Sequence, residues 1–382
     1  WFNARKLGLE RQLQFGKTLQ KHFLQISVCR NNERQQPNNQ NWRSLNIKIE
    51  MKKLNLITLL IVLITLGANA QEKFVNNLSK VPASLNPSFH AFKDKTRIGV
   101  LAEFASQSQG NQSQHKYAFG STAFEEYNFQ LGVDLFNNNL NNSGFNYTSA
   151  ALSYMYKLVL KNDWILYPGI TAAYSNYRYD FNNLTFQDQI NIFTGQISAN
   201  TIDPITASEN VGYLDMGASV LIHNDINTLF GLSLKHLNQP RISSKQSENN
   251  VNLNMLISGQ FGYEMDINKY GQAKLPEHSY LYLFNAVTIQ GPNTRLDFYQ
   301  DVTLGNFSIG INEHLSYLEN ASFSEIGFAT SLTLETFEFG LNYRLPFGGE
   351  AKQYIPNSLE LFLVFDISRF KERRRSDYSR FY

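Results

Sequence analysis

The sequence has little cysteine, little proline and little charge. Its 382 residues include one cysteine and ten prolines, and 17% are charged, against roughly 25% in an ordinary soluble domain. One cysteine excludes a disulfide scaffold, an iron–sulfur protein and a cysteine-rich zinc site. The few prolines and the 42% hydrophobic content argue against a disordered chain. The length suits one large domain or two ordinary ones.

The apolar run at residues 54–66 is too short for a transmembrane helix, because it has 13 residues and a membrane-spanning helix needs about 20. Lys52 and Lys53 precede it, and Ala68-Asn69-Ala70 follows it. Residues 51–70 therefore have the three parts of a secretory signal peptide, with an uncleaved anchor as the alternative. Since such a signal is read at the N-terminus, we expect residues 1–50 to be upstream translation that is not native. No cysteine follows the cleavage site, so we expect no lipoprotein anchor.

The net charge changes when this leader is set aside. Residues 1–70 hold 11 of the 34 basic and 3 of the 32 acidic residues, so the formal charge of +2 becomes −6 for residues 71–382. Residues 71–370 alone carry 18 basic and 27 acidic residues, a net −9. An acidic chain of this kind gives no support to nucleic-acid binding.

Apolar and polar residues alternate with a period of two after residue 95. In the stretch 359–367, every second residue from Leu359 to Ile367 is apolar, and stretches 127–135, 251–263 and 336–347 repeat the pattern. Nothing comparable has apolar residues at helical spacing. The alternation predicts an all-β protein.

The alternating runs predict about fourteen strands, with an error of about two. Most have 10–14 residues, about twice the length of a soluble strand, and suit a tilted membrane crossing of about 9–11 residues. We place them at 96–105, 115–124, 127–136, 145–157, 164–180, 210–222, 228–237, 251–264, 278–290, 294–304, 307–315, 323–334, 336–346 and 358–370.

The connections between these strands alternate in length. Residues 125–126, 305–306 and 335 form tight turns, whereas 137–144, 181–209, 238–250 and 346–357 form longer polar loops. Segments 265–277 and 291–293 depart from this rule. Short periplasmic turns that alternate with long outer loops are typical of a transmembrane, outer-membrane antiparallel β-barrel.

Charged residues on the polar faces separate a membrane barrel from a soluble sandwich, the main alternative. In a dry sandwich core each would cost several kcal/mol without a partner, whereas the lumen of a wide barrel can pair or hydrate them. Aromatic residues near the strand ends could form the interfacial girdles of such a barrel. The inward charges that we expect are Asp134, Asp215, Lys235, Arg344, Glu360 and Asp366.

The last predicted strand closes on Phe370, like the terminal strand by which such barrels are recognised for insertion. A basic tail, residues 371–382, follows it. The tail is either a solvated end or a docking element for a periplasmic partner.

Catalytic and metal-binding motifs are absent from the sequence. The histidines after residue 70 are scattered without metal-ligand spacing, and there is no G-x-S-x-G, P-loop or G-x-G-x-x-G motif. We therefore expect no enzyme activity, no cofactor and no metal. A lipid hydrolase whose Ser and His come from different strands stays open, although we expect His236 to be a packed or interfacial side chain on a strand.

Two short segments stand out, residues 82–89 (PASLNPSF) and residues 231–240 (GLSLKHLNQP). With the fourteen-strand pattern and the leader, they resemble the PorP/SprF family, outer-membrane proteins of the type IX secretion system of Bacteroidota. The resemblance covers residues 71–370, and the second segment is its specific part. The basic tail is a departure, because many members end soon after the last strand.

The resemblance implies a non-enzymatic barrel that supports secretion or surface attachment of cargo proteins, such as the adhesins of gliding motility. Its partners would be the secretion machinery, the C-terminal signal domain of the cargo and outer-membrane lipid. The outer loops 181–209 and 238–250 would make the protein contacts. The alternative is an outer-membrane pore for small or hydrophobic solutes.

Within the two segments, five residues are candidates for partner binding: Asn86, Pro87, Asn238, Gln239 and Pro240. They also read as rigid turn residues, because proline fixes φ and asparagine bonds its own backbone. Shaping the barrel mouth and contacting a partner are both open. The expected domains are 1–50 upstream, 51–70 signal peptide, 71–95 periplasmic or lumenal segment, 96–370 barrel and 371–382 tail.

Overall fold

The computed structural model describes residues 75–106, 112–140, 144–179, 189–190, 196–198, 209–224, 226–242, 251–269, 271, 275–317, 321–347 and 355–367. The chain divides into two units, Trp1–Thr65 and Leu66–Tyr382, and all described residues belong to the second. The predicted upstream segment, signal peptide and basic tail lie outside the described residues, as do Phe370 and most of loop 181–209.

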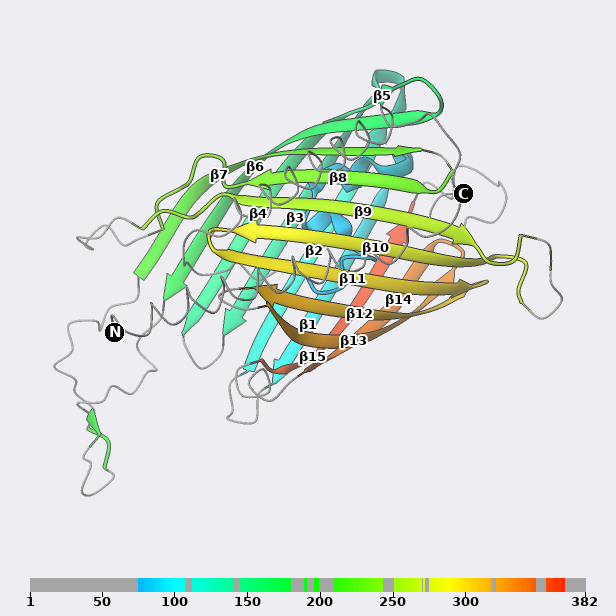
Figure 1. The fold of residues 1–382 in the computed structure, drawn as a ribbon. Helices are drawn as coiled ribbons and strands as arrows, with labels where there is room; N and C mark the ends of the chain where they lie inside the picture. The colour runs from blue at the N-terminus through cyan, green and yellow to red at the C-terminus, as the bar shows by residue number, and fades with distance from the viewer. Residues whose placement is uncertain are drawn as a thin grey trace, which may run out of the picture. The chain divides into compact units, whose positions relative to one another are not determined.

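Fourteen long antiparallel strands form a closed barrel (Figure 1). Consecutive long strands pair with each other, and β1 pairs with β15. The long strand β4 pairs directly with β6, because β5, which lies between them in the chain, has only two residues. The strands are β1 (Arg97–Ser106), β2 (Gln112–Phe124), β3 (Phe129–Leu140), β4 (Phe145–Tyr156), β5 (Leu158–Val159), β6 (Trp164–Tyr179), β7 (Glu209–Asn224), β8 (Thr228–Lys235), β9 (Leu256–Asp266), β10 (Ser279–Gln290), β11 (Asn293–Leu304), β12 (Phe307–Tyr317), β13 (Ala321–Leu334), β14 (Phe337–Pro346) and β15 (Asn357–Asp366). Closure leaves no unpaired edge, as a sheet in lipid requires.

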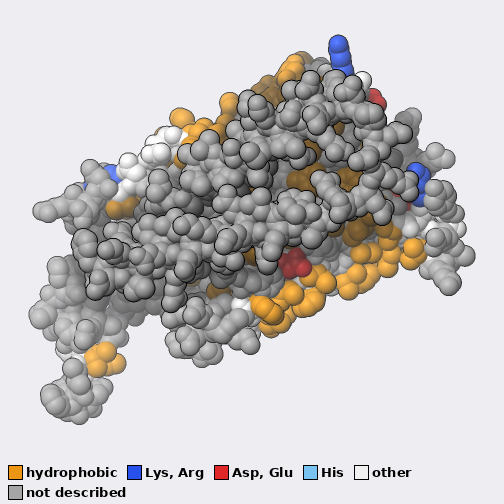
Figure 2. Space-filling model, viewed as in Figure 1, with side chains coloured by type: hydrophobic (Ala, Val, Ile, Leu, Met, Phe, Trp, Pro, Cys, Tyr) orange, Lys and Arg blue, Asp and Glu red, His pale blue; other side chains and the backbone are white. Residues whose placement is uncertain are grey.

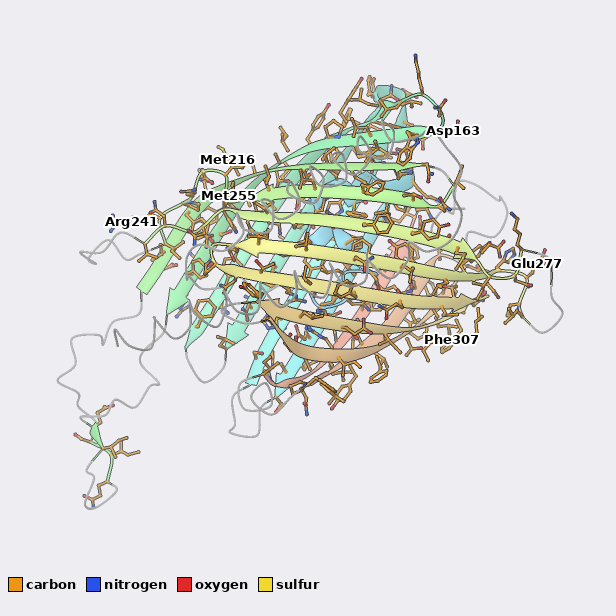
Figure 3. All side chains as sticks on the ribbon, viewed as in Figure 1. Asp163, Met216, Arg241, Met255, Glu277 and Phe307 are labelled. Carbon is orange, nitrogen blue, oxygen red and sulfur yellow. The ribbon has the colours of Figure 1, made fainter. Side chains whose placement is uncertain are left out.

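The barrel has two different rims. We call the rim at the start of β1 and the end of β15 the terminal rim; Asp163, Glu277 and Phe307 lie on this side (Figure 3). The opposite end, where Arg241 and Met255 lie, is the loop rim. Short connections such as 125–128, 305–306 and 335–336 lie at the terminal rim, whereas the end of β6, the start of β7, the end of β8 and the start of β9 lie at the loop rim.

The two faces of the wall differ in chemistry. On β15, Leu359, Leu361 and Leu363 are exposed, whereas the alternating residues Ser358, Glu360 and Phe362 are buried. On β1, Val100 is 50% exposed and its neighbour Leu101 only 4%. Hydrophobic side chains, orange in Figure 2, gather along the outside of the strands visible there. The outer face is apolar and the inner face polar, the pattern of a membrane barrel.

The predicted fold class and strand number are confirmed, and the departures have local causes. The strand predicted at 251–264 begins at Leu256, because its neighbour β8 ends at Lys235. His236 therefore lies just beyond the strand and not on it, with a φ of 58°. Residues 251–253 pair instead with 240–242, where Leu253 N donates to Pro240 O over 2.9 Å.

The strand predicted at 127–136 is displaced toward the loop rim. It begins at Phe129 because Glu125–Tyr127 forms a 3₁₀ turn, η3, that ends at Asn128 with a φ of 54°. It also continues to Leu140, because the asparagines that we assigned to a loop pair with β2 and β4. Polar composition there therefore does not mark the end of the ladder.

A segment of the chain lies inside the barrel. Residues 75–95, which we call the plug segment, include two 3₁₀ helices, η1 (Pro82–Ser84) and η2 (Pro87–Asp94). Leu78, Leu85 and Phe89 are at most 2% exposed and pack on inward side chains of β4 and β6–β11. The plug segment is blue in Figure 1 and forms the core of the barrel. No helix in the described part of the chain is long and apolar enough to span a membrane.

Introducing charge on the outer face tests which residues contact lipid. Leu341 lies in the middle of β14 on this face, and Leu345 lies near its loop-rim end. We expect Leu341→Arg to destabilise the folded barrel by about 2–4 kcal/mol and Leu345→Arg by about 0–1 kcal/mol. Urea titration in lipid vesicles, followed through Trp164, measures both. Equal costs would contradict a membrane belt centred on Leu341.

Candidate functional site: the plugged lumen

The first half of the plug segment is held by β11, β14 and β15. Both carboxylate oxygens of Glu360 accept backbone N–H groups of the plug segment, one from Asn76 and one from Asn77, each at 3.0 Å. Tyr299 donates its hydroxyl to Asn76 O over 2.5 Å. Lys80 Nζ lies 2.5 Å from Glu338. Wall side chains therefore satisfy backbone groups of the plug segment that have no secondary-structure partner.

The second half of the plug segment contacts β8, so the two sequence segments that stood out meet inside the barrel. Ser233 Oγ donates to Leu85 O over 2.9 Å, and Lys235 Nζ donates to Ser84 O over 2.8 Å. Residues 82–89 and 231–240 are about 150 positions apart in the chain. Their shared role in the structure is to join the plug segment to the wall.

Gly231 makes this close approach possible. A Cβ atom there would lie 2.8 Å from Asn86 Nδ2, 2.5 Å from Gln260 Oε1 and 3.3 Å from Phe89. The space is used by a hydrogen bond, because Asn86 Nδ2 donates to Gln260 Oε1 over 2.8 Å. Any larger residue at 231 would displace either the plug segment or Gln260.

Helix η2 connects the plug segment to β3, to β6 and to Lys157, which directly follows β4. His90 Nε2 lies 2.9 Å from Asp134, which also accepts the hydroxyl of Tyr117. Near the end of η2, Asp94 forms an ion pair with Lys157 and accepts the hydroxyl of Tyr167 over 3.2 Å. The plug segment thus has partners on strands all around the barrel.

The candidate residues of the first segment are buried. Asn86 is 0% exposed and begins η2: its Oδ1 accepts the N–H of Ser88 over 3.0 Å, and its Nδ2 also donates to Val220 O over 3.2 Å. Pro87 is buried as the first residue of η2. Asn86 is an N-cap whose side chain has two further hydrogen-bond partners, Val220 and Gln260, and both belong to the barrel wall.

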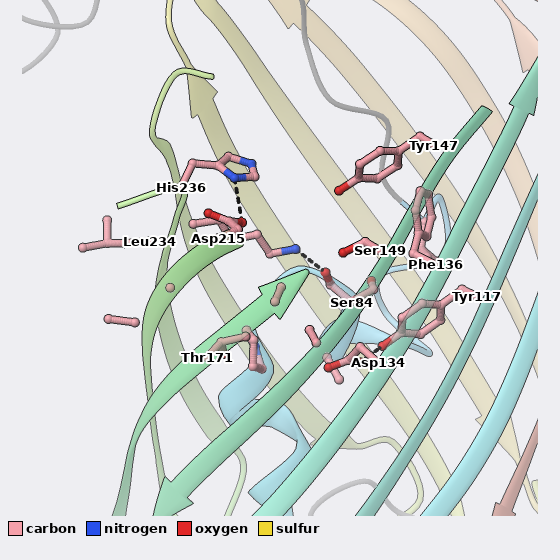
Figure 4. A pocket seen from close by; sticks show the side chains of 18 residues that line it. Ser84, Tyr117, Asp134, Phe136, Tyr147, Ser149, Thr171, Asp215, Leu234 and His236 are labelled. Atoms are coloured by element: carbon pink, nitrogen blue, oxygen red, sulfur yellow. Dashed lines mark hydrogen bonds and ion pairs between the residues drawn. The ribbon is translucent and has the colours of Figure 1, made fainter. Parts of the chain in front are cut away.

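The candidate residues of the second segment shape the loop rim. Asn238 donates to Leu214 O over 2.7 Å and accepts Met216 N over 3.2 Å, so its side chain continues the edge of β7. Gln239 is exposed and has a φ of 42°, whereas Pro240 is buried. His236 Nδ1 lies 2.8 Å from Asp215 Oδ2 (Figure 4). Of the five candidates, Asn238 and Gln239 are the ones a partner could reach from outside.

The expected inward charges all have partners, four of them in the plug segment. In the plug segment, His90 is the partner of Asp134 and Ser84 that of Lys235. Glu360 contacts Asn76 and Asn77, and Asp366 contacts Lys95. Asp215 contacts His236, and Arg344 forms an ion pair with Glu325. These contacts confirm that the charged faces point into the lumen.

The plug segment leaves a cavity on either side. The loop-side cavity encloses about 820 Å³, part of it open to solvent, between Ser84 and Pro87 of the plug segment and strands β2–β8 (Figure 4). The terminal-side cavity spans about 1000 Å³, also partly open to solvent, and is bordered by four cations: Lys80, Lys93, Lys95 and Arg97. Two carboxylates, Glu338 and Asp366, also border it. The lumen is therefore two chambers of different character.

Comparison with known families decides the identity of this barrel. Residues 67–365 match the description "Type IX secretion system membrane protein PorP/SprF". The chain belongs to the PorP/SprF family. The match spans the plug segment and nearly all the strands, so a PorP/SprF chain of this kind is an outer-membrane β-barrel of the type IX secretion system. No curated protein matches the sequence.

Solved barrels resemble this PorP/SprF chain only distantly. Omp33 of Acinetobacter baumannii has 8% identity and a TM-score of 0.42, with 72% of this chain and 99% of Omp33 covered. The CymD monoaromatic hydrocarbon channel has 9% identity and a TM-score of 0.43, covering 79% and 95%. BamA of Haemophilus ducreyi, lacking its first three POTRA domains, has 9% identity and a TM-score of 0.38, covering 71% and 70%. None of these similarities bears on function.

Sequence reasoning missed the residues that receive the plug segment. Glu360, Lys235 and Asp134 were recognised as inward charges, but their partners lie about 40 to 280 positions away in the chain. Ser233 and Gly231 were noted only as part of a segment. Among the described residues, no group of three or more His, Cys, Asp or Glu side chains could hold a metal ion.

Substitution of Gly231 tests the docking of the two segments. We expect Gly231→Val to displace Asn86 and Phe89, since overpacking of a tight site costs about 1–3 kcal/mol. A reporter Ala83→Cys, in a chain without Cys29, should then react several times faster with a maleimide. Gly120→Val is the matched control, because a Cβ there has its nearest neighbour at 4.0 Å. Unchanged labelling in Gly231→Val would mean that the plug segment does not depend on this contact.

Proposed function

We propose that this protein supports the secretion or surface attachment of type IX cargo proteins, without enzymatic activity. In this proposal residues 51–70 are cleaved as a signal peptide, residues 71–95 form the lumenal segment, and the loop rim faces the outside of the cell. The C-terminal signal domain of the cargo, such as a gliding adhesin, binds at the loop rim. The family match and the filled lumen together support it.

The filled lumen is the observation that favours a role in secretion over the alternative, a pore for small or hydrophobic solutes. A barrel of fourteen strands has room for a channel, but here the plug segment occupies it with contacts on opposite walls, from Glu360 of β15 to Lys235 of β8. A pore for small solutes would need this segment to leave. A protein that presents a fixed loop rim to a partner needs the plug segment to stay in the lumen.

The loop rim offers a surface of suitable character. Leu237, Gln239 and Arg241 are exposed in the connection after β8, while Pro240 and Leu253 anchor the same connection beneath. Exposed apolar and amide side chains on an anchored loop are a common basis for protein contact. We assign this connection, with the outer loop 181–209, to cargo binding.

A deletion strain tests the proposed function. We expect one or a few type IX cargo proteins to be retained or released into the medium, while exported proteins that use other routes reach their destinations. Surface proteomics of the deletion and complemented strains measures this. Normal display of every type IX cargo in the deletion strain would contradict the proposal.

Complementation with a loop variant locates the contact. Gln239→Asn introduces a residue type that tolerates positive φ while shortening the exposed side chain. We expect reduced recovery of cargo with the purified barrel, measured by quantitative co-purification. The matched control is Gly120→Ala on the outer face of β2, which should leave recovery unchanged.

Single-channel recording separates this function from the pore. The intact protein should conduct poorly in a planar bilayer, and deletion of residues 75–94 should raise conductance by about tenfold or more as the two chambers join. If the deletion variant does not fold, Gly231→Val, which displaces the plug segment, should also raise the conductance. Large, stable conductance in the intact protein, together with normal cargo display in the deletion strain, would favour the pore.

A further inference from the structure

Three polar residues interrupt the apolar outer face on β10, β11 and β12. Asp297, Tyr299 and Asp301 of β11 are at most 2% exposed and point into the lumen. Because side chains alternate along a strand, Gln300 between them points outward. The same alternation places Asn285 of β10 outward between Phe284 and Ala286, and Glu313 of β12 outward between Asn312 and His314. We call Asn285, Gln300 and Glu313 the outer polar patch.

The members of the outer polar patch are neighbours on the sheet. Asn285 and Glu313 both pair with Phe298, from opposite sides, and Gln300 is two residues along from Phe298. Gln300 Nε2 donates to Glu313 Oε2 over 2.9 Å. Register and hydrogen bonding therefore join the three polar groups into one cluster.

The outer polar patch lies within the apolar belt and not at its edge. Outward residues follow it toward the loop rim and toward the terminal rim on the same strands, and these flanking residues are apolar. Toward the loop rim they are Val287, Leu296 and Leu315, and toward the terminal rim they are Leu281, Val302 and Ile309. A charged residue in contact with lipid at this depth is costly, and intramembrane ionisable residues are usually functional.

The charge balance of this face identifies the kind of partner. Strands β9–β14 contain only two Lys or Arg residues, Arg295 and Arg344. Both contact inward carboxylates, Asp297 and Glu325 respectively. The outward side of these strands therefore has one carboxyl group, Glu313, and no cation among its described residues. A second copy of the chain docked through the same face would bring another carboxyl group and no counter-charge.

We propose that the outer face of β10–β12 docks a second, different integral outer-membrane protein, which presents a lysine or arginine to Glu313 within the membrane. Gln300 orients the carboxyl group, and Asn285 supplies a further amide to the contact. The pair is worth more in lipid than in water, since the low dielectric strengthens the attraction of opposite charges. This lateral interface is separate from the proposed cargo contact at the loop rim.

Site-specific photocrosslinking in the organism that makes the protein tests the proposal. A photoreactive phenylalanine analogue replaces Phe298 or Ile311, outward neighbours that leave the outer polar patch intact. Irradiation should yield one discrete adduct with another outer-membrane protein, identified by mass spectrometry. The same analogue at Leu152 of β4, an exposed outward site on another part of the barrel, should give no such protein adduct.

Variants then test the role of Glu313. We expect Glu313→Leu to lower the adduct yield by about tenfold or more, because losing one partner of a desolvated charge pair weakens binding strongly. Thr330→Leu is the matched control, since the Thr330 hydroxyl bonds Ser308 O within the wall. Heat-modifiable mobility on gels shows whether each variant has folded.

Four results would overturn the inference. They are adducts with lipid alone, equal protein adducts at Leu152, an adduct with a second copy of this chain, and an unchanged yield in a folded Glu313→Leu variant. None of them depends on the secretion phenotype, so the cargo proposal and the lateral interface can fail separately.

Discussion

A wall of fourteen strands encloses more space than its own inward side chains can fill, and this constraint shapes the rest of the molecule. An eight-stranded barrel is just wide enough to be packed by its wall. Here the remaining volume is occupied by the plug segment, whose short 3₁₀ helices leave many backbone groups without intrahelical partners. Such groups must be paired when buried. The inner face of the wall is polar because it supplies those partners.

The carboxyl group of Glu360 shows how far this pairing goes. It lies on β15, 0% exposed, opposite Glu103 in the register with β1, and it accepts consecutive N–H groups at the start of the plug segment. A buried carboxylate in that place without donors would be costly. With them it fixes the position of a segment that has little regular structure. Lys235, Ser233 and Gln260 play the same part on the opposite side of the lumen.

The structure separates three surfaces with different chemistry. The loop rim carries an anchored but exposed connection, the terminal-side cavity is rich in cations from the plug segment, and the outer face of β10–β12 carries a hydrogen-bonded polar patch in an apolar surround. The three surfaces lie on different parts of the same barrel, so a contact at one of them does not cover the others.

The sequence alone determined the wall of this protein. Alternation with a period of two is a local property, and it predicted fourteen strands with ends mostly within a few residues, because lipid on one side and a polar lumen on the other impose the pattern on every strand. The asparagines of β3 and the shortened β8 were mispredicted where composition and ladder pairing disagree. Only the tertiary structure decided that residues 82–89 lie against residues 231–240 inside the barrel, and that Glu313 joins Gln300 within the apolar belt. Contacts of this kind depend on how the strands are ordered and closed around the lumen, and the spacing of residues within a single segment does not predict them.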